Sequence, residues 1–74
     1  MSLPMAEFNA GLPSTRQVQN WIKSKNKVEI KLMTNDLLVG TILWQDGDCL
    51  CLVLEQGKSV LVWRQAIAYC TTHP

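Results

Sequence analysis

The residues best placed to do chemistry are Arg64 and Gln65, a cation and an amide between two apolar runs at 60–63 and 67–70. A strand, a tight polar turn and a second strand would expose both side chains. A guanidinium can bind phosphate bidentately, and an amide offers a donor and an acceptor to a nucleobase. No acid–base partner stands nearby, so this turn suits binding better than catalysis. The simpler alternatives are an ordinary exposed arginine and a glutamine that braces the turn.

The other reactive side chains form no recognisable catalytic or metal-binding set. The only histidine is His73, and the chain has neither a Ser/His/Asp arrangement nor a glycine-rich phosphate loop. Cys49 and Cys51 share one face of an expected strand, and Cys70 stands apart. A zinc site would need two pairs of ligands. We therefore expect a protein that is not an enzyme and that binds no metal or cofactor. Its cysteines are expected to be reduced and structural, which indicates a cytoplasmic protein.

Length and composition favour one small domain. The chain has 74 residues, 47% of them hydrophobic, and a net charge of +1 that by itself indicates no particular partner. A lone domain of this size is marginally stable, and oligomerisation often compensates. No apolar run approaches the ~18 residues of a membrane span. Residues 1–7 lack the pattern of a signal peptide.

The first part of the chain predicts an arm followed by a helix. Residues 1–12 show no periodicity and are expected to form a flexible arm. Ser14 and Gln17 match a capping box, with Ser14 as the N-cap. The apolar spacing that follows predicts a helix over residues 15–25, which Asn26 can stop.

From residue 28 the apolar period changes to two, which predicts strands. We expect strands over residues 28–33, 37–44, 49–54, 59–63 and 66–71, within a domain that spans 13–72 and leaves 73–74 as its C-terminal end. Gly40 suits a bulge or a sharp bend, and Asp48 is expected to cap the turn at 45–48. The predicted fold is mainly β with one N-terminal helix: a strongly bent five-stranded antiparallel sheet, or partly open barrel. Its last two strands would be apolar edges, and their pairing between subunits would close a ring.

The order of these elements resembles the Sm-like fold over about residues 14–72. Gly40 and Asp48 match its first motif, and Trp63-Arg64-Gln65-Ala66-Ile67 matches its second motif in the Hfq branch, where the block is typically Tyr-Lys-His-Ala. The resemblance implies a ring, hexameric in the family, that binds single-stranded RNA. It further implies a role in post-transcriptional regulation, in which the ring holds segments of small RNA and mRNA.

The resemblance implies three RNA-contacting regions, each with departures from the family pattern. Cys49 and Leu50 replace a glutamine and a stacking aromatic on the proximal face, and Lys31 replaces a tyrosine on the distal face. The implied residues are Arg64, Gln65, Leu50 and Cys49 at the proximal pore, Lys23, Lys25 and Lys27 at the rim, and Lys31 and Asn35 at the distal face. Each lysine has a simpler interpretation as a solvated charge. These departures look most like the cyanobacterial members of the family.

The same departures motivate a second hypothesis. Loss of the aromatic stack and of the adenine-reading tyrosine would weaken RNA binding, since stacking contributes ~1–3 kcal/mol per base. The ring would then act mainly as a scaffold for a protein partner. Trp44 could be an exposed anchor for that partner, or it could cover the mouth of the barrel. Trp63 is expected to pack in the core or in a subunit interface; the alternative is a stacking platform for a base.

Overall fold

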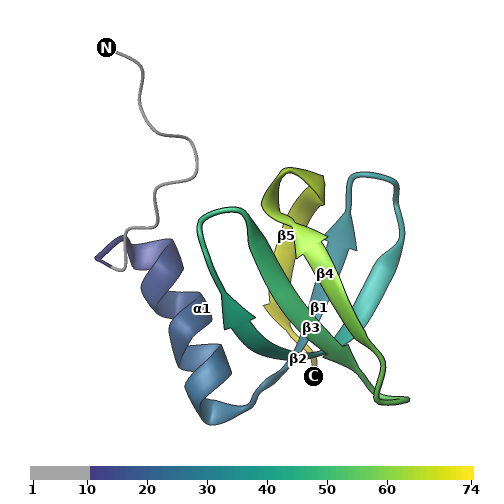
Figure 1. Cartoon of the computed structure of the whole chain (residues 1–74), viewed down its shortest axis with the longest axis horizontal. Helices are drawn as coiled ribbons and strands as arrows, with labels where there is room; N and C mark the ends of the chain where they lie inside the picture. The colour runs from purple at the N-terminus through teal and green to yellow at the C-terminus, as the bar shows by residue number, and fades with distance from the viewer. Residues whose placement is uncertain (1–10) are drawn as a thin grey trace.

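A computed structural model describes residues 11–74 and confirms the predicted fold of one helix followed by five antiparallel strands (Figure 1). The elements are α1 (Pro13–Ser24), β1 (Lys27–Leu32), β2 (Leu37–Gln45), β3 (Cys49–Leu54), β4 (Ser59–Trp63) and β5 (Ile67–Thr72). The predicted arm lies almost entirely outside the described residues. Within residues 11–74, no helix is long and apolar enough to cross a membrane.

The observed N-cap of the helix lies two residues before the predicted N-cap, Ser14. Its N-cap is Leu12, which makes no side-chain cap hydrogen bond, and Pro13 occupies the first helical position. The predicted capping box of Ser14 and Gln17 is therefore wrong. Proline is favoured at the first helical position because its fixed φ suits a helix and its missing N–H is not needed there.

The helix ends at Ser24, one residue earlier than predicted, and Lys25 is its C-cap. Lys25 adopts the left-handed conformation, with φ 54° and ψ 40°. Its N–H donates to Ile22 O at 3.2 Å, and the N–H of Asn26 donates to Trp21 O at 3.0 Å. These two bonds satisfy carbonyls that the end of a helix leaves unpaired, and they fix the direction in which the chain enters β1.

One face of the sheet forms the core. Val28 and Ile30 on β1 are fully buried, which confirms the predicted inward face of that strand. They form a cluster with Ile42, Leu50, Leu52 and Val62, and α1 packs against this cluster through Val18, Trp21 and Ile22. The helix thus covers the apolar face that the curled sheet cannot cover by itself.

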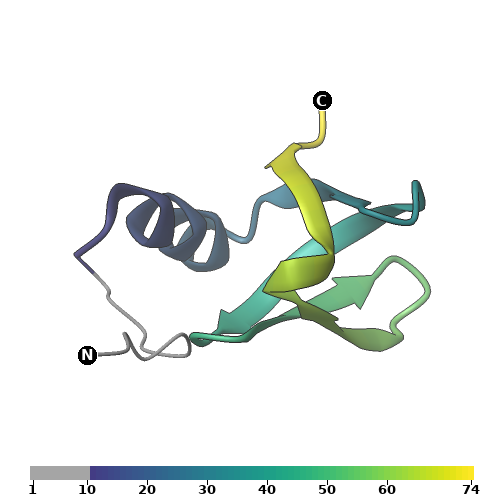
Figure 2. The ribbon, with the colours of Figure 1, turned by 90° about the horizontal axis from the view of Figure 1, so that it is seen from above.

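The strands follow the order β4-β3-β2-β1-β5, so β4 and β5 are the sheet edges, as predicted. In Figure 2, β5 (yellow) runs steeply across the other strands, which shows how strongly the sheet curls. The fifth strand begins at Ile67, one residue later than predicted, because Arg64–Ala66 form a 3-10 turn. Three side chains on the edge strands stay about half exposed: Leu61, Trp63 and Tyr69.

The bulge in β2 and its glycine are separate features of the strand. The pairing of β2 with β3 shifts between Ile42 and Trp44, which places a bulge at Leu43, three residues beyond the predicted position. Gly40 has a different function: a Cβ there would lie 2.3 Å from the carbonyl oxygen of Val53. The glycine is therefore needed because two backbones approach each other closely.

Gly40→Ala should destabilise the protein more than Gly57→Ala does. The first substitution forces β2 and β3 apart, which typically costs about 1–3 kcal/mol. The second meets no atom within 4 Å and strains only a backbone φ of +90°. Thermal unfolding at one fixed protein concentration measures the difference. Equal midpoints for the two variants would show that the strand approach at Gly40 is not tight.

Candidate nucleic-acid interface

The turn that carries Arg64 and Gln65 is held at both ends by backbone hydrogen bonds. The N–H of Arg64 donates to Asp48 O at 2.8 Å, and the N–H of Met33 donates to Ala66 O at 2.7 Å. The first bond anchors the turn to the loop between β2 and β3, and the second anchors it to the loop between β1 and β2. Both predicted site residues therefore sit on a fixed backbone between the two edge strands.

The guanidinium of Arg64 is oriented by two further hydrogen bonds. Its Nε donates to Asp46 O at 3.0 Å, and its Nη2 donates to Gln45 Oε1 at 2.7 Å. Both acceptors are neutral groups, so the arginine is held without being paired to a carboxylate through these bonds. Its remaining N–H groups make no hydrogen bond to residues 11–74 and can meet a phosphate.

Asp46, and not the predicted Asp48, caps the loop between β2 and β3. Its Oδ1 accepts the N–H of Asp48 at 2.9 Å and the N–H of Cys49 at 2.8 Å. These bonds lower the pKa of Asp46 below its ordinary 3.8, and the charge of Arg64 lowers it further. The carboxylate thus stays ionised and fixes the loop that in turn orients Arg64.

Arg64 and Gln65 line a surface hollow of about 300 Å³ together with Gly47 and Asp48. The amide of Gln65 is exposed and has no hydrogen-bond partner within residues 11–74, so the structure does not use it as a brace. The carboxylate of Asp48 is also exposed and unpaired in that part of the chain. The hollow therefore presents a cation and a free amide, but also an anion that repels phosphate.

The other two residues expected at the pore are buried. Leu50 is 2% exposed and belongs to the core, and Cys49 is 8% exposed. Burial and the nearby carboxylates raise the pKa of the Cys49 thiol. Neither side chain offers a surface to a base in this chain, and neither lines the hollow. A larger aromatic at Leu50 would overpack the core before it could stack on a base.

The expected rim lysines lie around the end of the helix and are only partly free. Lys23 and Lys25 are exposed, and neither has a side-chain partner within residues 11–74. Lys27 forms an ion pair with Glu55 of the loop between β3 and β4. The structure therefore leaves two of the three lysines available to a polyanion.

The expected distal residues lie on β1 and in the turn that follows it. Lys31 is half-buried and pairs in register with Leu37 on β2 and with Tyr69 on β5. Asn35 adopts a φ of 76° in the turn between β1 and β2, as its tolerance of positive φ predicted. Tyr69 is 52% exposed and was not recognised from the sequence. Its position beside Lys31 follows only from the register of β1 and β5, which the sequence alone does not give.

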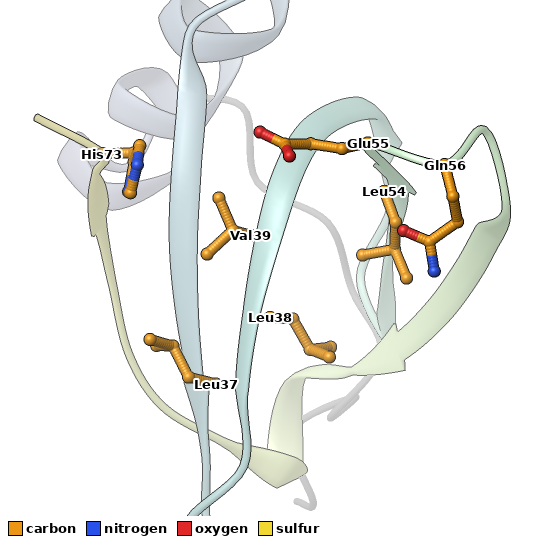
Figure 3. Close-up of a pocket in the computed structure, with 7 residues that line it drawn as sticks. All are labelled: Leu37, Leu38, Val39, Leu54, Glu55, Gln56 and His73. Carbon is orange, nitrogen blue, oxygen red and sulfur yellow. The ribbon is translucent and has the colours of Figure 1, made fainter.

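A second hollow, of about 400 Å³, lies between β2 and the loop between β3 and β4 (Figure 3). Its lining mixes apolar residues, among them Leu37, Val39 and Leu54, with polar ones, and its ionisable groups are already paired. Glu55 pairs with Lys27, and Nδ1 of His73 meets the Glu29 carboxylate. Within residues 11–74, no group of three or more His, Cys, Asp or Glu could hold a metal ion.

Asp46→Ala should lower the thermal unfolding midpoint at pH 7, because two backbone N–H groups lose their acceptor. The pKa of this carboxyl is depressed in the folded state, so its stabilisation is fully present above the ordinary value of 3.8. That stabilisation disappears as the pH falls through the lower folded-state pKa. The difference between the midpoints of wild type and variant should therefore begin to shrink as the pH falls below 3.8. A difference that does not shrink at all between pH 5 and pH 2 would show that the charge of Asp46 is not what stabilises the loop.

Comparison with known proteins agrees with this geometry. Residues 12–72 match the family model described as Hfq related. The crystal structure of an Hfq protein from Anabaena sp. is 46% identical, with a TM-score of 0.76, and the match covers 85% of this chain and 100% of that one. No curated protein matches this chain.

A second solved structure shows the same fold at lower identity. It is a crystal structure of Hfq, described as a pleiotropic translational regulator, with 21% identity and a TM-score of 0.75. The match covers 78% of this chain and 95% of that one. The resemblance to Hfq, including its cyanobacterial form, is confirmed by the Anabaena match and the family model. This chain therefore belongs to the Hfq-related family.

Proposed function

We propose that this chain forms a ring that binds single-stranded RNA, and that it holds segments of small RNA and mRNA in post-transcriptional regulation. A cytoplasmic location belongs to the same proposal. The observation that carries it is the place of Arg64 and Gln65, on a fixed turn between the two edge strands. Membership of the Hfq-related family supports the same function.

The backbone of β4 supports ring closure by strand pairing. The N–H of Arg64 donates to Asp48 O, and the N–H of Leu54 donates to Lys58 O, both at 2.8 Å. Hydrogen-bonded pairs alternate along an antiparallel ladder. Counting by twos from these bonds, Leu50–Val62 and Leu52–Val60 are hydrogen-bonded pairs, and the Cys51–Leu61 pair between them is not. The N–H and C=O of Leu61 therefore point to the open edge.

The open edge of β5 offers a matching partner. His73 N–H donates to Lys27 O at 2.8 Å, which by the same alternation turns the backbone of Cys70 outward. Pairing β4 of one subunit with β5 of the next would satisfy both edges. It would also cover part of Leu61 and Tyr69, which are each about half exposed. A hexamer, the ring of the family, would repeat the turn of Arg64 six times around one axis.

The charges of the turn predict weak binding. Arg64 supplies the phosphate contact and Gln65 the contact to a base edge, while Asp48 lies in the same hollow and opposes phosphate. The buried Leu50 offers no stacking face. Binding should therefore depend chiefly on charge and fall steeply with salt.

A protein scaffold is the second candidate function. Asp46 and Asp48, on the loop between β2 and β3, both lie beside Arg64, so two carboxylates surround one guanidinium. Trp44 is 42% exposed on β2 and shares a cross-strand row with Cys51 of β3 and the exposed Leu61 of β4. An exposed tryptophan beside further apolar surface suits a protein contact.

Leu61→Pro should abolish the oligomer and leave the subunit folded. Proline removes an N–H that points to the open edge and not to β3, and edge strands tolerate proline at such positions. Native mass and far-UV circular dichroism measure the two effects. Val62→Pro is the contrasting control, because Val62 is buried and pairs with Leu50, so this change should unfold the subunit itself. An unchanged native mass for Leu61→Pro would show that subunits do not meet at β4.

Arg64→Ala should remove most of the RNA affinity and flatten its salt dependence. One lost phosphate contact lowers the slope of log K against log salt by about one. Fluorescence anisotropy with uridine-rich and adenine-rich oligonucleotides at two salt concentrations measures both quantities. Lys58→Ala is the matched control, because it removes one exposed positive charge from the other end of β4.

Three results separate the two candidate functions. Salt-sensitive wild-type binding that Arg64→Ala weakens and Lys58→Ala does not supports the RNA site. Equal binding by wild type and Arg64→Ala would show that RNA does not contact this turn. The absence of wild-type binding even at low salt would favour the protein scaffold.

A further inference from the structure

Gln45 joins the helix to the arginine of the turn. Its Nε2 donates to Thr15 O and to Gln19 Oε1, both at 3.1 Å, while its Oε1 accepts from Arg64 Nη2 at 2.7 Å. A guanidinium can only donate, so the amide oxygen must face Arg64 and the amide nitrogen must face α1. One neutral side chain thus sets the distance between a helix and a cation that lie far apart in the sequence.

Both ends of this connection are rigid. Thr15 is 6% exposed and is the buried residue of α1, so its carbonyl is a fixed acceptor. Gln45 ends β2 and pairs with the core residue Leu50. A second bond, from Arg64 Nε to Asp46 O, holds the guanidinium from another side. With two of its N–H directions fixed, the guanidinium has little freedom left, and its remaining N–H groups keep one orientation.

We propose that Gln45 is a positioning residue for RNA binding, which contacts no RNA itself and orients Arg64 toward a phosphate. The proposal rests on the proposed RNA-binding function of this turn. The chemistry of the side chain matters, because an amide holds the guanidinium and leaves its charge intact. A carboxylate of the same length could still accept from Arg64, but it would lose both bonds to α1 and would cancel that charge. The position of α1 thereby becomes part of the binding site.

A double-mutant cycle tests whether Gln45 acts through Arg64. Gln45→Met keeps the length of the side chain and removes its hydrogen bonds, and it is made in the wild-type and in the Arg64→Ala background. The probe is a fluorescent hexauridine in an anisotropy titration. Gln45→Met should weaken binding about three- to tenfold in the wild type, as the loss of one orienting hydrogen bond predicts. It should have no effect once Arg64 is absent.

Gln45→Glu provides the second, charge-based readout. It keeps an oxygen that accepts from Arg64, but the new carboxylate neutralises the guanidinium. The slope of log K against log salt should therefore become shallower by about one and approach the slope of Arg64→Ala. Gln17→Ala is the control: Gln17 is an exposed glutamine of α1 with no side-chain partner within residues 11–74. It should leave affinity and slope unchanged.

The outcomes distinguish this inference from the proposed function. Native mass first confirms that each variant keeps the wild-type assembly. If Gln45→Met weakens binding equally in both backgrounds, Gln45 has a general structural role and the inference is wrong. If Arg64→Ala weakens binding and neither Gln45 variant does, the inference is also wrong, although the RNA site stands. If Arg64→Ala itself has no effect, the proposed RNA site fails first.

Discussion

Two open sheet edges constrain everything else in this small protein. A five-stranded sheet with β4 at one edge and β5 at the other leaves outward-facing N–H and C=O groups on both strands. Water can satisfy these groups, but the apolar side chains Leu61, Trp63 and Tyr69 stay about half exposed beside them. Pairing the two edges between subunits would satisfy the backbone and cover apolar surface in one step. The strong curl of the sheet suits such pairing to a closed ring.

The turn between those edges explains why a binding site would form there. Its backbone is anchored to two other loops, through Asp48 and through Met33. Gln45 and Asp46 then orient the guanidinium of Arg64, which keeps free N–H groups and its charge. The same loop brings the carboxylates of Asp46 and Asp48 close to the arginine. The loop thus orients Arg64 for a phosphate but also weakens its attraction for one. A site of this kind would select its ligand by orientation more than by strong attraction.

The sequence predicted those features that local periodicity determines. The third and fourth strands match their predicted bounds, and the edge positions of the last two strands followed from their order. The cap prediction failed because Pro13 and Ser14 both suit the start of a helix. Pro13 takes the first helical position and leaves Ser14 inside the helix. The bulge at Leu43 was missed because strand register is not visible in one sequence.

The candidate site could be predicted only in part, for the same reason. Arg64 and Gln65 stood out because they interrupt two apolar runs, but the partners of Arg64 lie 18 and 19 residues away in sequence. Leu50 and Cys49 were expected at the surface, yet the first four residues of β3 are all buried. Alternation cannot assign faces on a strand that is covered on both sides. The Asp46-Gly47-Asp48 segment was a signal for a capped loop, and only the structure shows which aspartate caps it.

The proposed function requires that copies of this chain close a ring and place Arg64 around one RNA site. Native mass spectrometry of the wild-type protein with a short oligouridine measures assembly and stoichiometry together. We expect a closed oligomer, about 50 kDa for six copies of the 8.3 kDa chain, with one oligonucleotide bound per ring. A monomer at micromolar concentration, or one oligonucleotide on each separate chain, would contradict it.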